Sequence, residues 1–147
     1  MITKYKIFES IDDISIIKWA KYGDLIKVAE CIKNGEINET DYNNETALFY
    51  SVSEDYSDID IFNLLISSPD IDVNIQNNSM LETALFWAPW TQTIEMIKCG
   101  ANWNLKNVDG ETFVDKMNKP SQQRLKKLFP YKYRQYKKLK KSDTFNL

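Results

Sequence analysis

The residues available for chemistry are limited, because the 147-residue chain contains no histidine. Histidine is the usual general base near neutral pH and the commonest ligand of transition metals in proteins. Without it, neither a Ser-His-acid triad nor a Cys-His pair can form, and the two cysteines cannot supply the four ligands of a structural zinc site. The four glycines are also not arranged as a phosphate-binding loop.

Carboxylates remain as candidates for acid-base chemistry, since paired Asp or Glu residues can serve as general acid and general base. Two such pairs occur in short acidic stretches, Asp58 with Asp60 and Asp70 with Asp72. Acids that alternate along short polar stretches are more typical of solvated loops than of a catalytic site. We therefore expect a protein that is not an enzyme and that has no catalytic residues, no metal and no cofactor.

The cysteines and the hydropathy of the chain indicate the compartment. Cys31 and Cys99 lie in apolar helical patterns, which predicts two buried, reduced thiols. No stretch approaches the ~18 consecutive apolar residues of a membrane span. The first residues, MITKYKIFESIDD, lack the apolar segment that follows a basic one in a signal peptide. These features favour a cytoplasmic protein.

Charge is distributed unevenly along the chain, although the net charge is only −2. Residues 1–115 hold 8 Lys or Arg and 20 Asp or Glu, which gives a net charge of −12. Residues 116–147 hold 11 basic residues and one acid, Asp143, which gives +10. An acidic body and a basic C-terminal tail are expected to attract different partners.

The pentapeptide ETALF occurs at residues 45–49 and again at residues 82–86, which lie 37 positions later. Each copy is followed by a short helical pattern and then by an apolar helical run, over residues 61–66 and 94–100. The same order of segments occurs once earlier in the chain and once later, where residues 121–128 form the second helical pattern. Four units result, over residues 9–40, 41–77, 78–106 and 107–128.

This unit resembles the ankyrin repeat, whose period is ~33 residues. The residues that carry the resemblance are Ala20, Gly23, Leu25, Val28, Thr46, Leu48, Thr83, Leu85, Ala88, Asp109, Gly110 and Thr112, with closing elements at 35–38, 72–74 and 100–104. The resemblance implies an all-α solenoid of stacked helix-turn-helix units. Both central units have Ala-Leu-Phe where the family has Pro-Leu-His, so apolar packing of Phe49 and Phe86 is expected to replace the hydrogen bonds of that histidine.

Capping residues indicate where the helices begin and end. Thr46, Thr83 and Thr112 precede the first helix of three units, where a hydroxyl group can accept a bond from a backbone N–H. Gly35 and Gly100 follow second helices, where glycine adopts a left-handed conformation at the least cost. Stacking then covers the apolar stripe that one unit alone would expose to water.

The resemblance implies that the stack binds another protein through its concave side, which the loop tips and first helices form. An acidic, aromatic surface suits a basic protein partner, and occupation of that partner's active surface would make the chain an inhibitor or an immunity protein. A host-directed effector or scaffold that recruits a cellular protein is the alternative use of the same surface. No small-molecule substrate is expected, and the protein is expected to be a monomer. The predicted partner contacts are Tyr42, Asn43, Glu45, Tyr50, Ser53, Met80, Glu82, Trp87, Trp90, Val108, Asp109 and Glu111.

The tail suggests a different class of function. Pro130 interrupts any helix that would continue from the last repeat, which predicts a repeat domain over residues 1–128 and a basic tail over residues 129–147. Its basic residues alternate with tyrosines and could contact nucleic acid or an anionic membrane. A cationic cap on the acidic stack and a solvated terminus are the alternatives. The basic contacts of such a tail would be Lys132, Arg134, Lys137, Lys138, Lys140 and Lys141.

Overall fold

A computed structural model of the chain describes residues 15–145. Within that range the regular structure consists of eight α-helices and one 3-10 turn, with no strand, so the all-α prediction is confirmed. Residues 9–14, with which the first predicted repeat opens, lie outside the described residues. The chain divides into two compact units, Met1–Ala101 and Asn102–Leu147. The predicted boundary at residue 128 lies inside the second unit, and that division of the chain stays a prediction.

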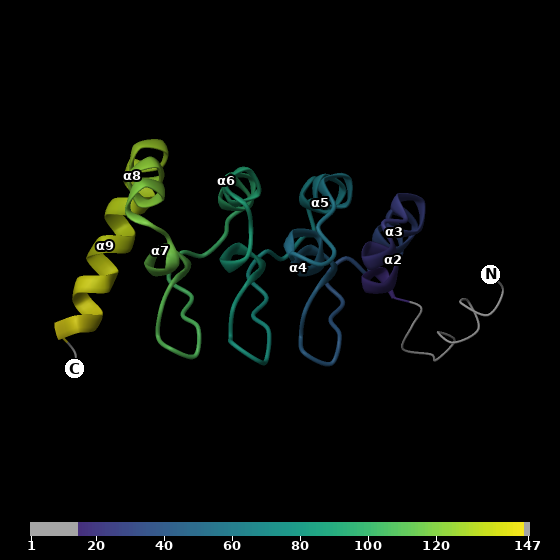
Figure 1. Ribbon diagram of the computed structural model, residues 1–147, viewed down its shortest axis with the longest axis horizontal. Helices are drawn as coiled ribbons and strands as arrows, with labels where there is room; N and C mark the ends of the chain where they lie inside the picture. Colours follow the sequence, from purple (N-terminus) through teal and green to yellow (C-terminus); the bar gives the residue numbers. More distant parts are fainter. Residues whose placement is uncertain (1–14, 146–147) are drawn as a thin grey trace. The chain divides into compact units, whose positions relative to one another are not determined.

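The helices of the first unit form two layers. One layer contains the first helix of each pair and the other contains the second helix, and each helix packs against the next one in its own layer (Figure 1). The first layer consists of α2 (Ile16–Tyr22), α4 (Ala47–Val52) and the 3-10 turn η2 (Ala84–Phe86). The second layer consists of α3 (Leu25–Lys33), α5 (Ile59–Ile66) and α6 (Trp90–Lys98).

The core of the first unit lies between these layers. Val28 of α3, Ile61 and Leu65 of α5 and Ile97 of α6 are fully buried, as the apolar spacing of three and four residues predicts. Full burial of such a side chain contributes about 1.5–3 kcal/mol. Leu65→Ala would therefore cost roughly 2–5 kcal/mol, because the neighbouring pairs cannot fully close the cavity.

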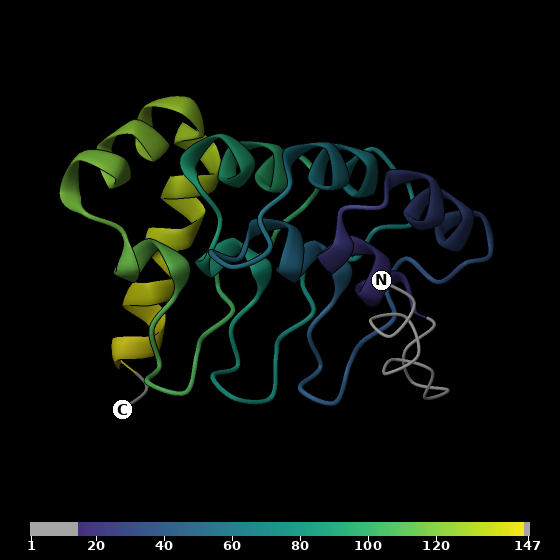
Figure 2. The ribbon, with the colours of Figure 1, turned by 45° about the vertical axis from the view of Figure 1, so that its right-hand side comes forward.

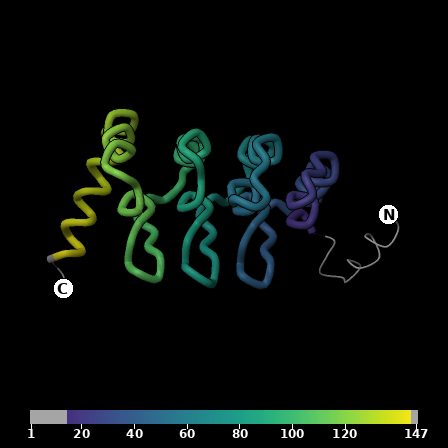
Figure 3. The backbone as a smooth tube through the Cα atoms, in the orientation of Figure 1, coloured from purple at the N-terminus to yellow at the C-terminus, as the bar shows by residue number. Residues whose placement is uncertain are grey.

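Two hairpin loops project from the first unit, and the same hydrogen bonds build both of them. In the first loop, the N–H of Asp41 donates to the carbonyl oxygen of Glu45 over 3.1 Å. In the second, the N–H of Asn77 donates to the carbonyl oxygen of Glu82 over 2.9 Å. The side-chain oxygen Oδ1 at the loop start then accepts two backbone N–H bonds from inside the loop, in both cases. Figure 3 shows the two loops side by side in blue and teal.

Threonine caps two of the three predicted first helices. Thr46 accepts a bond from the N–H of Phe49, and Thr112 forms a capping box with Asp115. Thr83 has the extended conformation of an N-cap but makes no side-chain cap bond, and the segment after it is only the short η2 turn. Pro89 explains the difference, because a proline disfavours the helical conformation of the residue before it and so prevents an α-helix from continuing through Ala88.

The second unit contains α7 (Phe113–Lys116), α8 (Lys119–Leu128) and α9 (Pro130–Phe145). Pro130 interrupts the helix as predicted, since it stands at the first position of α9, where its missing N–H removes no helical bond. The buried Trp103 anchors this unit, and its ring meets the edges or faces of Phe113, Phe129 and Tyr136 at centroid distances of 5.8 to 6.3 Å. Figure 2 shows α9 returning along α7 and the hairpin loop of the same unit.

Candidate partner-binding surface

The tips of the two hairpin loops in the first unit are fixed to each other by hydrogen bonds. The N–H of Asn78 donates to the carbonyl oxygen of Asn43 over 2.8 Å. The Nδ2 atom of Asn44 donates to the carbonyl oxygen of Gln76 over 2.8 Å, and the Nδ2 atom of Asn77 to Oε1 of Glu45 over 3.1 Å. Loops ordered in this way lose little conformational entropy when a partner binds them.

Tyr42 occupies the tip of the first loop and is 97% exposed. Its backbone is fixed by the neighbouring Asp41 and Asn43, whose own bonds close the loop. An aromatic side chain on an ordered loop and fully in water makes no contribution to the core of the protein. It can, however, bury a large area against a partner.

An aromatic row crosses α4 and consists of Phe49 and Tyr50 of α4, Trp87 after η2 and Tyr56 after α4. The ring centroids of Phe49 and Trp87 are 6.0 Å apart, those of Phe49 and Tyr50 are 6.2 Å apart, and those of Tyr50 and Tyr56 are 5.6 Å apart. The row ends in exposed side chains, because Trp87 is 47% exposed and Tyr56 is 42% exposed. Rings already packed against one another, edge to face or tilted, need little rearrangement to receive another apolar or cationic group.

Tyr50 connects this row to the first loop. Its hydroxyl group donates to Oδ2 of Asp41 over 2.6 Å, and Nζ of Lys21 lies 4.0 Å from the centre of its ring. Burial, followed by the hydrogen bond to Asp41, raises the pKa of Tyr50 above its usual value. The tyrosine therefore stays neutral and holds the loop in place.

The structure distributes the predicted partner contacts over three environments. Tyr42 and Trp87 are exposed in the first unit, and Val108, Asp109 and Glu111 are exposed on the loop of the second unit. Of the twelve predicted partner contacts, Glu82 is the one that is buried. The others are half-buried, namely Asn43, Glu45, Tyr50, Ser53, Met80 and Trp90.

Three of the predicted contacts lie in surroundings that the sequence did not predict. Glu82 is only 1% exposed, so its side chain is not available to a partner. Tyr50 is half-buried, and Asp41 and Lys21 already contact its hydroxyl group and its ring. Trp90 was expected on a first helix, but it is the first residue of α6 in the second layer, since Pro89 forms the N-cap and the helix begins earlier than its apolar pattern.

Two exposed apolar residues of this surface were not predicted. Leu81 is 44% exposed in the second loop, and Tyr56 follows α4 at the end of the aromatic row. The sequence carried a signal for Leu81, because this leucine precedes the repeated Glu-Thr pair, at Glu82 and Thr83, in an otherwise polar turn. We define the loop-tip surface as Tyr42 and Leu81 of the two loops, together with Trp87 after η2 and Tyr56 after α4. The aromatic row joins Trp87 and Tyr56 to Tyr50, which binds Asp41 of the first loop.

The predicted basic contacts of the tail lie on α9 and differ in whether they contact the rest of their own unit. Lys140 forms an ion pair with Asp115, and Tyr136 beside it is buried. The hydroxyl groups of Tyr136 and Thr112 are 2.9 Å apart, and Tyr136 donates to Oδ1 of Asp115 over 3.1 Å. Up to residue 145 the tail is therefore a helix packed within its own unit, with Lys132, Arg134, Lys137, Lys138 and Lys141 exposed.

The two thiols differ, and the prediction of two buried cysteines was wrong for one of them. Cys31 is buried, and this burial, together with a hydrogen bond to Glu36, raises its pKa to about 12. Cys99 is exposed at the end of α6, where its sulfur donates to the carbonyl oxygen of Ile66 over 3.6 Å. Cys99 is exposed because it lies just beyond the last residue of α6, so the apolar pattern of the helix no longer directs it towards the core.

Residues 15–145 contain no group of three His, Cys, Asp or Glu side chains placed to hold a metal ion. Among the helices in that range, none combines the length and the apolar character required to cross a bilayer. Compared with protein-family models and with curated proteins, the chain matches none of them.

Proposed function

We propose that the first unit is an ankyrin-type stack that binds a basic protein without catalysis. The proposal rests on one observation above all, the fully exposed Tyr42 on a loop that is fixed by hydrogen bonds. A solvent-exposed aromatic ring on an ordered loop is the kind of residue that concentrates binding energy at interfaces.

The recurrence of local structure supports the ankyrin type. Each of the three hairpin loops has a residue of positive φ directly before its Glu-Thr pair, at Asn44, Leu81 and Gly110. Left-handed conformations also follow the second helices, at Gly35 and Gly100. Corresponding backbone conformations at corresponding positions are what a repeated unit requires.

The charge of the first unit supports a basic partner. Residues 1–101 hold 17 acidic side chains and 7 basic ones, which gives a net charge of −10. Exposed acids, among them Glu54 and Asp55, lie in the chain next to Tyr56 of the loop-tip surface. A negative potential around an aromatic surface accelerates the encounter with a cationic protein and disfavours acidic competitors.

The test begins with identification of the partner. The full chain, carrying a photoactivatable phenylalanine analogue at position 42, is used to capture and identify a protein from native cells. That protein is then purified, and its affinity is measured by calorimetry against the wild type and three variants. We expect Trp87→Ala and Tyr42→Ala each to raise Kd about 30-fold, as for loss of ~2 kcal/mol.

Ile26→Ala is the matched control, because Ile26 is an exposed apolar residue on α3 in the other layer. Its Kd should stay within about twofold of the wild type, as for a residue outside the energetic centre of an interface. Unchanged affinity in both loop-tip variants would contradict the proposal. The activity of the partner, measured with and without the chain, then distinguishes an inhibitor from a scaffold that only recruits.

A further inference from the structure

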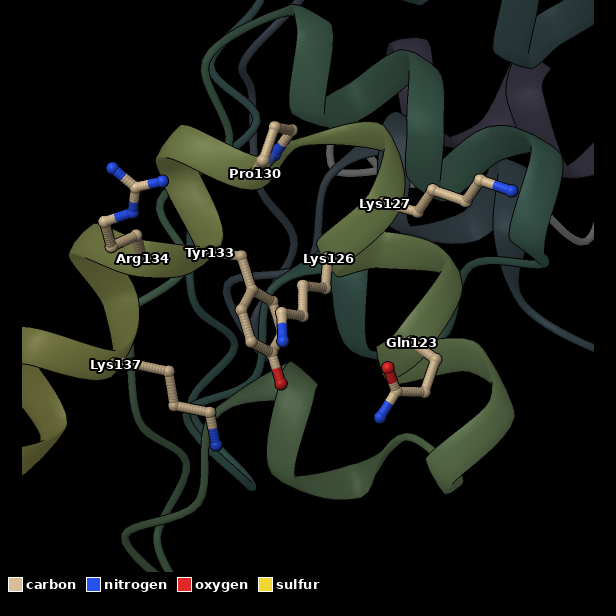
Figure 4. A pocket seen from close by; sticks show the side chains of 7 residues that line it. All are labelled: Gln123, Lys126, Lys127, Pro130, Tyr133, Arg134 and Lys137. Carbon is tan, nitrogen blue, oxygen red and sulfur yellow. The ribbon is translucent and has the colours of Figure 1, made fainter.

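A groove of about 780 Å³ lies between α8 and α9 in the second unit. Its walls are formed by Gln123, Lys126, Lys127, Pro130, Tyr133, Arg134 and Lys137. Figure 4 shows Tyr133 and Lys126 in the middle, with Lys137 of α9 on one side and Gln123 of α8 on the other. The groove exists because the helix is interrupted at Pro130, where α8 has ended and α9 begins. The basic faces of the two helices therefore border a common space.

The groove is strongly cationic. None of its lining residues is acidic, and within residues 15–145 none of its four cations forms an ion pair with a carboxylate. The whole second unit, residues 102–147, holds 12 basic side chains and 4 acidic ones. Unneutralised cations gathered along one groove concentrate positive potential, which attracts a polyanion.

An ordered aromatic ring lies among these cations. The ring of Tyr133 packs against Trp103 at 6.5 Å and against Tyr136 at 6.2 Å, which fixes its orientation from behind. The Nζ atom of Lys137 lies 5.6 Å from the ring centre. Tyr133 keeps part of its surface in solvent, so a planar group can stack on it. The amide of Gln123 offers both a donor and an acceptor at the edge of the groove.

We propose that this groove binds single-stranded nucleic acid, with the phosphates on Lys126, Lys127, Arg134 and Lys137 and a base on Tyr133. A combination of a cationic groove and an aromatic ring is how proteins hold single strands without reading sequence. A paired base would not expose its face to the tyrosine. This inference concerns the second unit only, and it holds or fails independently of the proposed partner of the first unit.

A membrane surface fits the groove less well. A helix that lies on a bilayer needs an apolar face that can enter the boundary of the acyl chains. The most buried ring of α9, Tyr136, packs against Trp103 and is not available for that purpose. Among the α9 side chains that the structure describes, the exposed apolar ones are Tyr131 and Leu139. Exposed lysines separate them, so they do not form a continuous apolar face.

The test measures binding of the full chain to a fluorescent single-stranded oligouridylate of twelve nucleotides by anisotropy, between 50 and 200 mM salt. Four phosphate contacts predict a slope of about −2.8 for log K against log salt, which is roughly a 50-fold loss of affinity over that range. Tyr133→Ala should weaken binding by roughly 5- to 150-fold, and Tyr133→Phe should stay within about twofold because it keeps the stacking face.

Two double variants locate the site. Lys126→Ala with Arg134→Ala removes two lining cations and should reduce the slope to about −1.4. Lys138→Ala with Lys141→Ala is the matched control, because these exposed lysines of α9 do not line the groove. The control should keep the slope of the wild type.

An equal loss of affinity in both double variants would contradict the proposal that the groove is the binding site. It would indicate that the nucleic acid is attracted to the positive charge of the second unit as a whole. Binding to vesicles that contain phosphatidylserine, without binding to the oligonucleotide, would also overturn the proposal and favour a membrane surface. The lysine and arginine substitutions are all on the surface, so far-ultraviolet circular dichroism should be unchanged and loss of binding cannot be attributed to unfolding.

Discussion

Among residues 15–145, Leu81 is the one whose backbone conformation fits its side chain least well. Its φ of 55° is left-handed, whereas Gly110 has the corresponding place in the loop of the second unit and Asn44 in the first loop. Left-handed conformations cost a residue with a Cβ roughly 1–2 kcal/mol, and asparagine and glycine much less. Leu81 is also exposed on the loop-tip surface. Its left-handed conformation therefore destabilises the fold at a position that is a candidate for binding.

We expect Leu81→Gly to raise the free energy of unfolding by about 0.5–1 kcal/mol, because relief of the left-handed strain exceeds the entropy that glycine adds to the unfolded chain. Urea denaturation followed by circular dichroism measures the change. Gly110→Leu is the reciprocal control, since a Cβ there meets no atom within 4 Å and only the conformational cost remains. Destabilisation by Leu81→Gly would mean that the leucine side chain contributes more to stability than its exposure suggests.

The thiols provide a second prediction at the scale of residues. Only the thiolate reacts with disulfide reagents, and with a pKa of about 12 Cys31 has almost no thiolate at pH 8. A native sample treated with a chromogenic disulfide reagent at pH 8 should therefore release one equivalent quickly, from Cys99, and a second only in denaturant. Cys99→Ser should abolish the fast phase. Rapid labelling of that variant while it remains folded would show that Cys31 is accessible.

At the scale of elements, the sequence predicted helices best where burial follows one face. α5 and α8 end at residues 66 and 128, where their predicted patterns end, and each begins two residues earlier than predicted. In α5 the buried residues Ile61 and Leu65 are four positions apart, as expected for a helix with one face in a core. The η2 turn was not foreseen as a 3-10 segment, since it depends on how Pro89 limits a helix that its own residues would favour.

Packing of α9 was beyond prediction for a different reason. It depends on Tyr136 meeting Thr112, 24 residues earlier, and no local pattern encodes such a contact. The same holds for the groove, because Lys126 and Lys127 of α8 were not among the predicted basic contacts, while Arg134 and Lys137 of α9 were. Only the break at Pro130 could have indicated that cations from both helices border one space.

The contacts of α9 predict how the stability of the second unit depends on pH. Burial opposes ionisation of Asp115, but hydrogen bonds from Lys140 and Thr112 outweigh it and lower the pKa of this carboxyl group. Its stabilising effect is therefore complete above its unfolded pKa of ~3.9 and is lost as the pH falls through the lower folded value. At the alkaline end, the bond to Asp115 raises the pKa of Lys140.

The stabilising effect of that lysine is complete below its unfolded pKa of ~10.4 and is lost as the pH rises through the folded value. We expect Asp115→Asn to lower the free energy of unfolding by ~1.5 kcal/mol at pH 7. Between pH 7 and pH 2 this difference should become smaller, because Asp115 becomes protonated in the wild type as well when the pH falls through its lowered pKa. Denaturation followed by the fluorine signal of 5-fluorotryptophan at Trp103 measures the effect. An equal difference at both pH values would mean that the charge of Asp115 is not the cause.

At the scale of the whole molecule, the acidic and the basic parts of the sequence correspond to the two compact units. The first unit, residues 1–101, has a net charge of −10, and the second, residues 102–147, holds most of the basic residues and has a net charge of +8. The two proposed surfaces share no residue, and each belongs to a different compact unit. Opposite charges select opposite ligands, so one chain can hold a basic protein and a polyanion through separate sites.

If the two sites are separate, substitutions in one unit should leave binding at the site of the other unit unchanged. The loop-tip pair Tyr42→Ala with Trp87→Ala should alter the Kd for the oligouridylate by less than about twofold, the usual error of additivity for independent sites. The groove pair Lys126→Ala with Arg134→Ala should likewise leave the affinity for the captured protein within about twofold. Anisotropy and calorimetry at the same salt concentration provide both values. If the groove pair weakened protein binding as strongly as the loop-tip pair does, the partner would require both units, and two independent sites could no longer be maintained.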